Sequence, residues 1–488
     1  MTEIRFVDTT LRDGHQSLWA SGMTTGMMLP VAERMDRAGF ESIELIAGAL
    51  FKKCVRELRE DPFELIRRVA KRITRTPLRL IASRINPFDY DPPSMYRLFL
   101  ELAFAAGIKE VRISDPWNGL PFWTPRVTLA REVGLAPLVN LIYSVSPRHT
   151  DEYYAERTRQ AASLPVYRLC LKDPGGLLTP ERMQTLVPVI LDNANGIHVE
   201  LHTHCTTGLG PLCAMEAIKL GIKTVNTAIP PLADGPSLPS LFNVTANARA
   251  LGFTPVIDEQ SLKPVSAHFM TIAGREGFPI GAPVEYDYAQ YLHQIPGGMI
   301  SNLGHQLRLV GLEDRLNEAL EETARVRAEL GYPIMVTPLS QFVGSQAAIN
   351  IVVGERYKEV TDQTIGYALG RYGEEGAAGM DPDIKDRILD RPRARELARQ
   401  GLPDPSLREM RRKYGGAGVS DEDLLLRWIV SREEVEIMRQ AAPPDEYLTA
   451  TQPLVTLIRE LTKRTECSRI DIRKPGFSVT LERRGAAR

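Results

Sequence analysis

The sequence has few cysteines, and they are not arranged in pairs. Its five cysteines lie at positions 54, 170, 205, 213 and 467 of 488 residues, without a Cys-x-x-Cys spacing. An odd, scattered set is more typical of a reducing cytosol than of a disulfide-linked secreted protein. The first residues enter an apolar run directly, without the apolar region of a secretory signal. We therefore expect a cytoplasmic protein.

Long apolar runs and an excess of one charge are also missing. No stretch approaches about 18 uninterrupted apolar residues, so we expect no membrane span. The net charge is −1, which argues against a nucleic-acid or acidic-membrane partner. The composition, with 43% hydrophobic and 25% charged residues, is that of a globular protein. A chain of 488 residues exceeds what one compact core usually holds, so two or more domains are expected.

Short apolar runs recur through the first 230 residues and predict strands. Segments with helical spacing separate them, for example 28–38, 63–73, 95–106, 181–193 and 209–220. Strand–helix alternation repeated eight times predicts an α/β fold, a closed (β/α)8 TIM barrel. The alternative is an open doubly wound sheet, but no glycine-rich phosphate-binding turn follows the first strand. The strands are expected near 4–8, 42–46, 79–83, 108–113, 137–142, 166–172, 198–202 and 223–228.

The pattern changes after about residue 275 to longer helical stretches, such as 313–330 and 421–441. We predict a barrel domain over 1–275, a mainly helical domain over 276–435 and a tail over 436–488. A charged, proline-containing stretch at 380–407 is expected to be a solvated connection. In the tail, a helix at 449–462 should precede a small hairpin, because apolar residues alternate on either side of a Lys-Pro-Gly turn.

Two histidines one residue apart, His202 and His204, end the seventh expected strand. Side chains at i and i+2 of a strand point to the same side, so the two imidazoles would form half of a metal site. Taken alone, the pair is equally consistent with two polar residues where a strand meets solvent. The residues at the other strand ends help to decide between these readings.

Several polar residues follow the expected strands at their carboxyl ends, where the active groups of such barrels lie. Asp13 follows the first strand, and Lys172 ends the sixth. A carboxylate and two imidazoles would supply three ligands for a divalent ion and leave open positions, as at catalytic metal sites. A free Lys172 would repel the ion, so spacing alone favours its salt bridge with Asp13 or Asp173. Further candidates at this rim are Arg12, His15, Gln16, Ser17, Arg112, Asp115 and Tyr143.

Five segments resemble the carboxyltransferase domain of biotin-dependent carboxylases. They are DTTLRDGHQS at 8–17, LKDPGGLL at 171–178, LHTHCTTG at 201–208, QIPGGMISN at 294–302 and VTPLSQFVG at 336–344. Members of this family that the chain resembles are the pyruvate carboxylase B subunit, the oxaloacetate decarboxylase α subunit and the small transcarboxylase subunit. The resemblance covers roughly residues 4–435, and the five motifs occur in the family's order.

The resemblance implies roles for individual residues. One divalent metal, with zinc, cobalt and manganese all suited to such ligands, would be bound by Asp13, Lys172, His202 and His204, with Lys172 carbamylated. Carbamylation converts the amine into an anion and removes its repulsion of the metal. Arg12 and Gln16 would face the biotin and substrate pocket. Thr337 would move a proton between biotin and substrate, with Ser340 nearby, although Thr337 is also compatible with a helix cap before Pro338.

The resemblance also implies the reaction and the partners. Carboxybiotin on a separate carrier would release CO2, which passes to a small enolisable acceptor similar to pyruvate or oxaloacetate. The helical domain would complete the active site. A Met-Lys-Met biotinylation loop is missing from the C-terminal region. A biotin carboxylase subunit and a biotin carboxyl carrier protein are therefore expected as separate chains. The tail would dock one of them or pack on its own protomer, and a homo-oligomer is expected.

The acceptor pocket departs from the family pattern. An Asp, an Arg and a Tyr usually hold the 2-oxo acid there, and the matching positions carry Lys52, Ser83 and Tyr90. Arg84 is adjacent, but a shift of one residue along a strand turns a side chain to the opposite face. We expect that Lys52 supplies the cation or that a loop shift brings Arg84 into the pocket. The acceptor is then not simply pyruvate, or it is held differently. Arg112 and Tyr143 complete the expected substrate-binding set.

Two other functions stay open at this point. A metal-dependent Claisen-type or retro-aldol enzyme shares the start of the first motif and the His-x-His strand end, although Lys172 and the later motifs argue against it. A non-catalytic scaffold subunit is the second alternative, and the convergent ligand set argues against that. The sequence does not distinguish carboxylation from decarboxylation.

Overall fold

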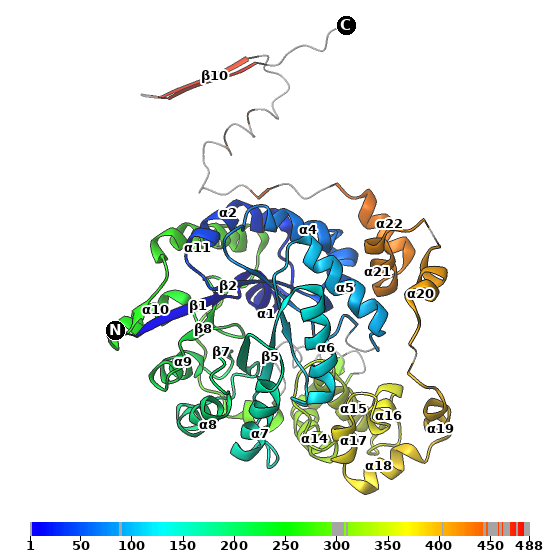
Figure 1. Cartoon of the computed structure of the whole chain (residues 1–488). Coiled ribbons are helices and arrows are strands. Elements are labelled where there is room, and N and C mark those ends of the chain that lie inside the picture. The colour runs from blue at the N-terminus through cyan, green and yellow to red at the C-terminus, as the bar shows by residue number, and fades with distance from the viewer. Residues whose placement is uncertain are drawn as a thin grey trace.

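Eight parallel strands close into a barrel in the computed structural model (Figure 1). Closure is shown by β1, which pairs in parallel with β2 on one side and with β8 on the other. The predicted TIM barrel is therefore confirmed, and the open-sheet alternative is wrong. The barrel strands are β1 (Glu3–Asp8), β2 (Ser42–Ala47), β3 (Leu78–Ile81), β4 (Glu110–Ile113), β5 (Ala136–Ile142), β6 (Arg168–Asp173), β7 (Val199–Thr203) and β8 (Thr224–Thr227), and a two-residue strand, β9 (Thr254–Pro255), extends beside β1.

The structure describes residues 2–86, 90–294, 307–308, 311–402, 404–416, 418–442, 446–447, 457, 461, 469–474 and 477–482. The motif at 294–302 lies outside them except for Gln294. The helix expected at 449–462 lies outside them except for residues 457 and 461.

An outer ring of helices surrounds the barrel (Figure 1). Several begin at residues typical of helix starts, because Asp61, Thr150 and Thr179 each accept a hydrogen bond from a backbone N–H in the first turn that follows. The helices and helical turns of the barrel are η1 (Thr10–Gly14), α1 (His15–Leu18), α2 (Thr25–Arg37), η2 (Gly48–Leu50), α3 (Phe51–Lys53), η3 (Cys54–Leu58), α4 (Pro62–Ala70), α5 (Pro93–Ala106), α6 (Leu120–Val133), α7 (Asp151–Ala162), α8 (Pro180–Asn193), α9 (Gly210–Lys219), α10 (Leu241–Ala250) and α11 (Glu259–Glu276).

The C-terminal half is mainly helical, and its helices pack in two groups. One group has its own apolar core, which Trp117 of the barrel joins. The other group, α20 to α22, shares the apolar core of the barrel and lies beside α4 and α5 (Figure 1). The packing therefore divides residues 276–435 into two parts. Their helices are α12 (Ala289–His293), η4 (Glu313–Arg315), α14 (Leu316–Glu329), α15 (Leu339–Val353), α16 (Asp362–Ala368), α17 (Glu374–Ala378), α18 (Pro382–Leu389), α19 (Pro392–Arg399), α20 (Leu407–Tyr414), α21 (Asp421–Ile429) and α22 (Arg432–Gln440).

Two expectations for this half are wrong. The stretch at 380–407 is not simply a solvated connection, because α18 and α19 lie in it. Pro382 and Pro392 stand at the start of these helices, where the missing N–H costs nothing. The single helix expected at 421–441 is two helices, since Ser431 forms a capping box with Glu434 and begins α22.

The tail hairpin has the predicted form. Strands β10 (Arg469–Lys474) and β11 (Phe477–Glu482) are antiparallel, and Figure 1 draws them away from the barrel. Before the hairpin, Tyr447 fixes the chain on the barrel: its N–H donates to Gly26 O at 2.9 Å and its hydroxyl donates to Glu276 at 2.9 Å. None of the helices that the structure describes has the length and apolarity needed to cross a membrane.

Candidate active site

A cavity of about 390 Å³ lies at the carboxyl ends of the barrel strands. The barrel supplies most of its wall, and Val336 and Thr337 close it from the side of the helical domain. Seven of the candidate site residues line the cavity: Arg12, Asp13, Gln16, Ser17, Lys172, His204 and Thr337. His202 does not line it. Residues from distant parts of the sequence therefore meet at the rim where the barrel fold predicts an active site.

Asp13, His202 and His204 come together as a possible metal-binding group. His202 Nε2 lies 3.2 Å from Asp13 Oδ2, and His204 Nε2 lies 3.5 Å from Asp13 Oδ1. The two Nε2 atoms are 3.3 Å apart. All three residues are buried, and the ligand atoms lie within 4.8 Å of one another. Burial raises the pKa of Asp13, but the nearby Arg12 and His204 outweigh it and hold that pKa well below its usual range.

Each histidine also has a partner on its other ring nitrogen. His204 Nδ1 lies 2.7 Å from the carbonyl oxygen of Pro236, and His202 Nδ1 lies 3.0 Å from Asn226 Oδ1. Because His204 Nδ1 donates to that carbonyl oxygen, the Nε2 lone pair of His204 faces Asp13 and is available to an ion, whereas His202 Nδ1 also lies 3.0 Å from the donor Arg112 Nη1. Burial lowers the pKa of His202 to about 3, so its imidazole is neutral near pH 7. Partners of this kind are typical of histidines that bind metals.

Lys172 lies beside these ligands without forming the salt bridge that its spacing suggests. It pairs with His202 in the register of β6 and β7, so both side chains face the same side. Asp13 pairs with Arg12 at 2.6 Å instead, and Asp173 accepts hydrogen bonds from Leu177 N and Leu178 N. Burial, with Arg12 nearby, lowers the pKa of Lys172 to about 8. About one tenth of the amine is then neutral at pH 7, far more than for an unperturbed lysine.

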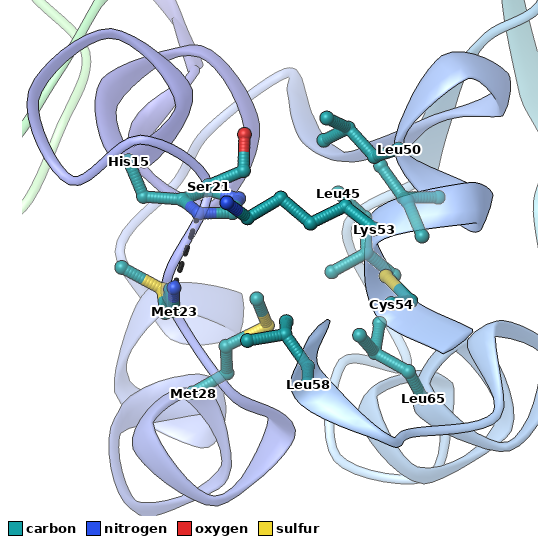
Figure 2. Close-up of a pocket in the computed structure, with 11 residues that line it drawn as sticks. His15, Ser21, Met23, Met28, Leu45, Leu50, Lys53, Cys54, Leu58 and Leu65 are labelled. Carbon is teal, nitrogen blue, oxygen red and sulfur yellow. Dashed lines mark hydrogen bonds between the residues drawn. The ribbon is translucent and has the colours of Figure 1, made fainter. Parts of the chain in front are cut away.

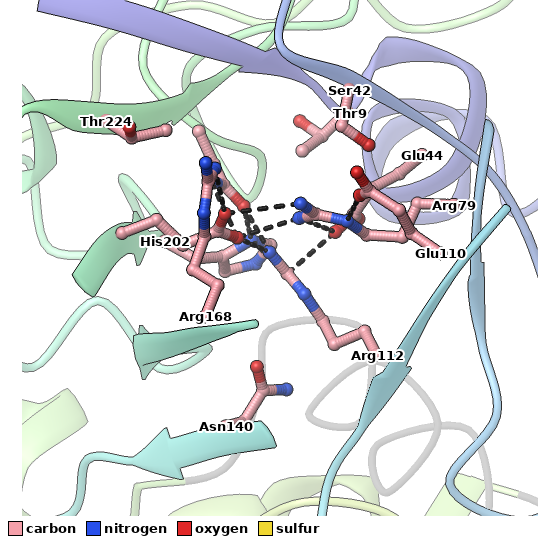
Figure 3. Close-up of polar contacts among 12 residues, drawn as sticks. Thr9, Ser42, Glu44, Arg79, Glu110, Arg112, Asn140, Arg168, His202 and Thr224 are labelled. Atoms are coloured by element: carbon pink, nitrogen blue, oxygen red, sulfur yellow. Dashed lines mark hydrogen bonds and ion pairs between the residues drawn. The ribbon is translucent and has the colours of Figure 1, made fainter. Parts of the chain in front are cut away.

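Buried charges fill the barrel beneath the cavity (Figure 3). Glu44 Oε2 lies 2.7 Å from Arg12 Nη2, and Glu44 Oε1 lies 2.8 Å from Arg112 Nη1. Glu200 pairs with both Arg112 and Arg79. Although burial opposes ionisation, Arg112 and Arg12 lower the pKa of Glu44 to about 2. This network fixes Arg12 at the floor of the cavity.

Some predicted substrate-binding residues do not reach the cavity. Arg112 is fully buried in the charge network, where its Nη1 lies 3.0 Å from His202 Nδ1. Lys52 is exposed in α3 and does not line the cavity, which does not support the expectation that it replaces the missing cation. Three more residues do not line the cavity: partly buried Tyr90, and buried Tyr143 and Ser340.

Two residues differ from their simplest sequence interpretation. Thr337 does not cap α15, because Pro338 precedes that helix and no side-chain cap bond is formed. His15, although it lies in the first motif, does not line the central cavity. It faces a separate cavity of about 10 Å³, beside Lys53 and Cys54, and Met23 N–H donates to its Nδ1 at 3.4 Å (Figure 2). That space holds about one water molecule at most.

The sequence interpretation missed the charge network, whereas the alternative that brings Arg84 into the pocket agrees with the cavity lining. Glu44, Arg79 and Glu200 each interrupt an apolar strand run with one charge, which is a visible sign of charges inside the barrel. Arg84 lines the cavity, although strand alternation predicted that it turns away. The alternation does not apply, because β3 ends at Ile81 and residues 82–84 already cross the rim.

Comparison with known proteins identifies the family. The family described as a conserved carboxylase domain matches residues 291–454. The B subunit of pyruvate carboxylase from Methanocaldococcus jannaschii is 34% identical over 444 residues, which cover 89% of this chain and 78% of that protein. The chain belongs to the carboxyltransferase family of biotin-dependent carboxylases. It is therefore a carboxyltransferase, and neither a Claisen-type enzyme nor a non-catalytic scaffold.

Two further proteins are similar to this carboxyltransferase, one in sequence and one in fold. The 2-oxoglutarate carboxylase large subunit of Hydrogenobacter thermophilus is 31% identical over 479 residues, which cover 92% of this chain and 71% of that protein. The carboxyl transferase domain of Rhizobium etli pyruvate carboxylase has the same fold, with a TM-score of 0.80 at 22% identity, over 90% of this chain and 77% of that one.

Proposed function

We propose that this carboxyltransferase moves a carboxyl group between biotin on a separate carrier and a small 2-oxo acid, with the help of one divalent metal. The observation that carries the proposal is that Asp13, Lys172, His204 and Thr337 line one cavity, with His202 in contact with Asp13 and His204. The relatives support the reaction class, because one is a pyruvate carboxylase subunit and another is a 2-oxoglutarate carboxylase subunit.

The residues fit a divalent ion such as zinc, cobalt or manganese. A carboxylate and two imidazoles are suitable N and O ligands, and each imidazole has a hydrogen-bond partner that orients it. We infer that Lys172, once carbamylated, is the fourth ligand. Its amine faces the same side as His202 and has no ion pair among the described residues, so it is free to react with CO2. A bound ion would act as a Lewis acid and stabilise negative charge on the acceptor oxygen.

Thr337 is the proton-transfer group in this proposal. Its hydroxyl gives a proton to the biotin nitrogen from which CO2 departs and takes a proton from the acceptor carbon. The resulting enolate carbon then forms a bond to CO2, so one proton and one carboxyl group change places. Arg12 lies at the floor of the same cavity, where its cation helps to stabilise the enolate oxygen. Gln16 faces the opening of the cavity and would contact biotin.

The carrier and the biotin carboxylase are proposed to be separate chains. Both of these relatives are named as subunits, which supports this arrangement. We infer that the hairpin β10–β11 docks one of these partners. Its register places Ile472 opposite Val479, and both apolar side chains are only partly buried. Two strands alone rarely form a stable unit in water, so a partner that covers one face would stabilise the hairpin.

The acceptor is proposed to be held differently from the family pattern. Ser83 cannot supply the guanidinium that binds a carboxylate through two hydrogen bonds, and Lys52 is exposed. We therefore propose that residues other than these hold the acceptor, and the relatives make pyruvate and 2-oxoglutarate the compounds to compare.

Reconstitution tests this function. The chain is combined with a biotinylated carrier and a biotin carboxylase, and carboxylation of pyruvate and of 2-oxoglutarate is measured. Thr337→Ala should lower the rate about 10²- to 10⁴-fold, as for a lost proton-transfer group, while Thr337→Ser keeps part of it. The metal content of both variants should equal that of the wild type. A Thr337→Ala enzyme with unchanged turnover would contradict the proposal.

A further inference from the structure

The cavity contains one guanidinium that forms no direct ion pair with a carboxylate of the described residues. Arg84 lines the cavity, its Nε has no hydrogen-bond partner, and no described residue forms an ion pair with it. The other arginine of the cavity, Arg12, is paired with Glu44 and Asp13. Burial, with Arg126 nearby, lowers the pKa of Arg84, but an arginine stays charged near pH 7. A positive charge of this kind in a concave site is available to an anion.

The nearest acids are already occupied by the backbone. Asp91 accepts hydrogen bonds from Ile85 N at 3.0 Å and Asn86 N at 3.2 Å. Asp115 accepts a hydrogen bond from Gly119 N at 2.9 Å. Both carboxylates are therefore held by the loops that shape this wall; they attract Arg84 electrostatically, but neither forms an ion pair with it among the described residues. Burying a charge without a partner is costly, so a structure that retains one gains stability when a ligand of opposite charge binds.

Two aromatic rings hold the guanidinium in place. Arg84 Cζ lies 5.5 Å from the ring centre of Phe122 and 5.7 Å from that of Tyr372. Phe122 belongs to α6 of the barrel, whereas Tyr372 comes from the helical domain between α16 and α17. Such cation–π contacts fix the cation without neutralising it. The position of Arg84 therefore depends on both domains.

Ser83 forms hydrogen bonds that hold the backbone, and the next residue, Arg84, extends from this wall into the cavity. Ser83 Oγ accepts a hydrogen bond from Ser114 N at 2.8 Å, and the Ser83 carbonyl oxygen accepts one from Arg126 Nε at 3.2 Å. These bonds fix the chain where it leaves β3. They explain why the residue after Ser83, and not Ser83 itself, presents a long polar side chain to the cavity.

We propose that Arg84 binds the carboxylate of the acceptor, and that Tyr372 of the helical domain completes this subsite. The assignment rests on the proposed function for the nature of the acceptor. It names a specificity-determining pair in this chain: Arg84 supplies the two N–H groups that a planar carboxylate requires, and the two rings orient them. An acceptor held in this way enters with its carboxylate toward α6 and its carbonyl toward the metal-ligand candidates across the cavity.

Binding of oxamate, an unreactive analogue of a 2-oxo acid, tests the assignment directly by calorimetric titration. Arg84→Gln should weaken binding about 10- to 100-fold, the loss expected for a charge-assisted pair, and Arg84→Lys should lose less because it keeps the charge. Tyr372→Leu should also weaken binding, whereas Tyr372→Phe should not. Arg97→Gln, which removes an exposed arginine, is the matched control and should bind as the wild type does.

Lys52→Gln separates the two candidate cations, and it should leave oxamate binding unchanged. Equal binding by wild type and Arg84→Gln, loss on Lys52→Gln, or no binding by the wild type would each overturn the assignment. Metal content and Thr337-dependent transfer are measured on the same samples. If oxamate binding requires Arg84 but biotin-dependent transfer is absent, the proposed function fails while the anion subsite stands. If biotin-dependent transfer is present but oxamate binding does not require Arg84, the proposed function stands and the anion subsite fails.

Discussion

At the scale of single residues, the barrel separates the charges that hold the fold from the charges that face ligands. Glu44 lies at the centre of the first group, since it pairs with Arg12 at the cavity floor and with Arg112 in the interior. Removing one member of such a buried pair leaves an uncompensated charge, which costs more than the pair itself contributes. Arg84 and Lys172 face the cavity and stay outside this network.

Glu44→Gln should therefore lower the free energy of unfolding by about 3–5 kcal/mol at pH 7, measured by urea denaturation. Glu101→Gln is the matched control, because Glu101 is exposed and its ion pair with Arg97 spans 3.8 Å at the surface. That control should change stability by less than about 0.5 kcal/mol. Equal effects of the two substitutions would show that the buried network does not stabilise the barrel.

The contribution of Glu44 should depend on pH with a defined sign. The pKa of Glu44 is lowered from 4.5 to about 2 in the folded protein, so its stabilising contribution is fully present above pH 4.5. It is lost as the pH falls from 4.5 toward about 2, and the lowering corresponds to about 3 kcal/mol. Unfolding free energies of wild type and Glu44→Gln should converge over this interval. A difference that is constant from pH 7 to pH 3 would contradict the assignment.

At the scale of elements, the eight barrel strands were predictable because each combines a short apolar run with a following helical segment. Their observed bounds agree with the sequence to within about two residues. The stretches that were predicted wrongly contain single residues whose local effect differs from what the average composition of the stretch suggests. Prolines at 382 and 392 begin helices in a segment that reads as charged and irregular, and Ser431 divides an apparently continuous helix.

The candidate site was predictable in part for the same reason. Asp13, Lys172 and His204 lie at strand ends, where the topology alone brings side chains together. The lining role of Arg84 was not predictable from alternation, because it depends on where β3 ends, and the exposure of Lys52 depends on the short α3 turn. Tyr372 reaches Arg84 only through the docking of a second domain, which no local pattern encodes.

Docking of the helical domain depends on close contact between α17 and the barrel. A Cβ on Gly376 would lie 2.4 Å from Cζ2 of Trp117, so Gly376→Ala must displace the indole or the helix. We expect a loss of about 1–3 kcal/mol in thermal denaturation. Gly274→Ala is the control, because Gly274 is exposed in α11 and a Cβ there meets nothing within 4 Å. It should be neutral or stabilise the helix by up to about 1 kcal/mol. Equal stabilities of the two variants would contradict this contact.

At the scale of the whole molecule, the chain combines a barrel that supplies the metal-ligand candidates with a helical domain that supplies Thr337 and Tyr372. The tail leaves from a fixed point, because Tyr447 is bonded to the barrel at Gly26 and Glu276. The chain that leads to the hairpin is thus fixed to the barrel at Tyr447.

Truncation after Tyr447 should weaken binding of the carrier or the carboxylase in pull-down titrations, because it removes the hairpin but keeps the anchor. Ile472→Asp in the full chain should do the same, while Arg473→Gln, on the opposite face of the strand, should not. The barrel should keep its thermal stability in all three variants. Unchanged assembly of the truncated chain would rule out docking by the tail.

The central claim is that the cavity binds a divalent ion through Asp13, His202, His204 and a carbamylated Lys172. Elemental analysis of protein purified without chelators tests it most directly. The wild type and His198→Ala, which changes an exposed histidine just before β7, should retain about one ion per chain. His202→Ala and Lys172→Ala should lose it together with turnover. A metal-free but active wild type, or full metal content and turnover in Lys172→Ala, would contradict the account.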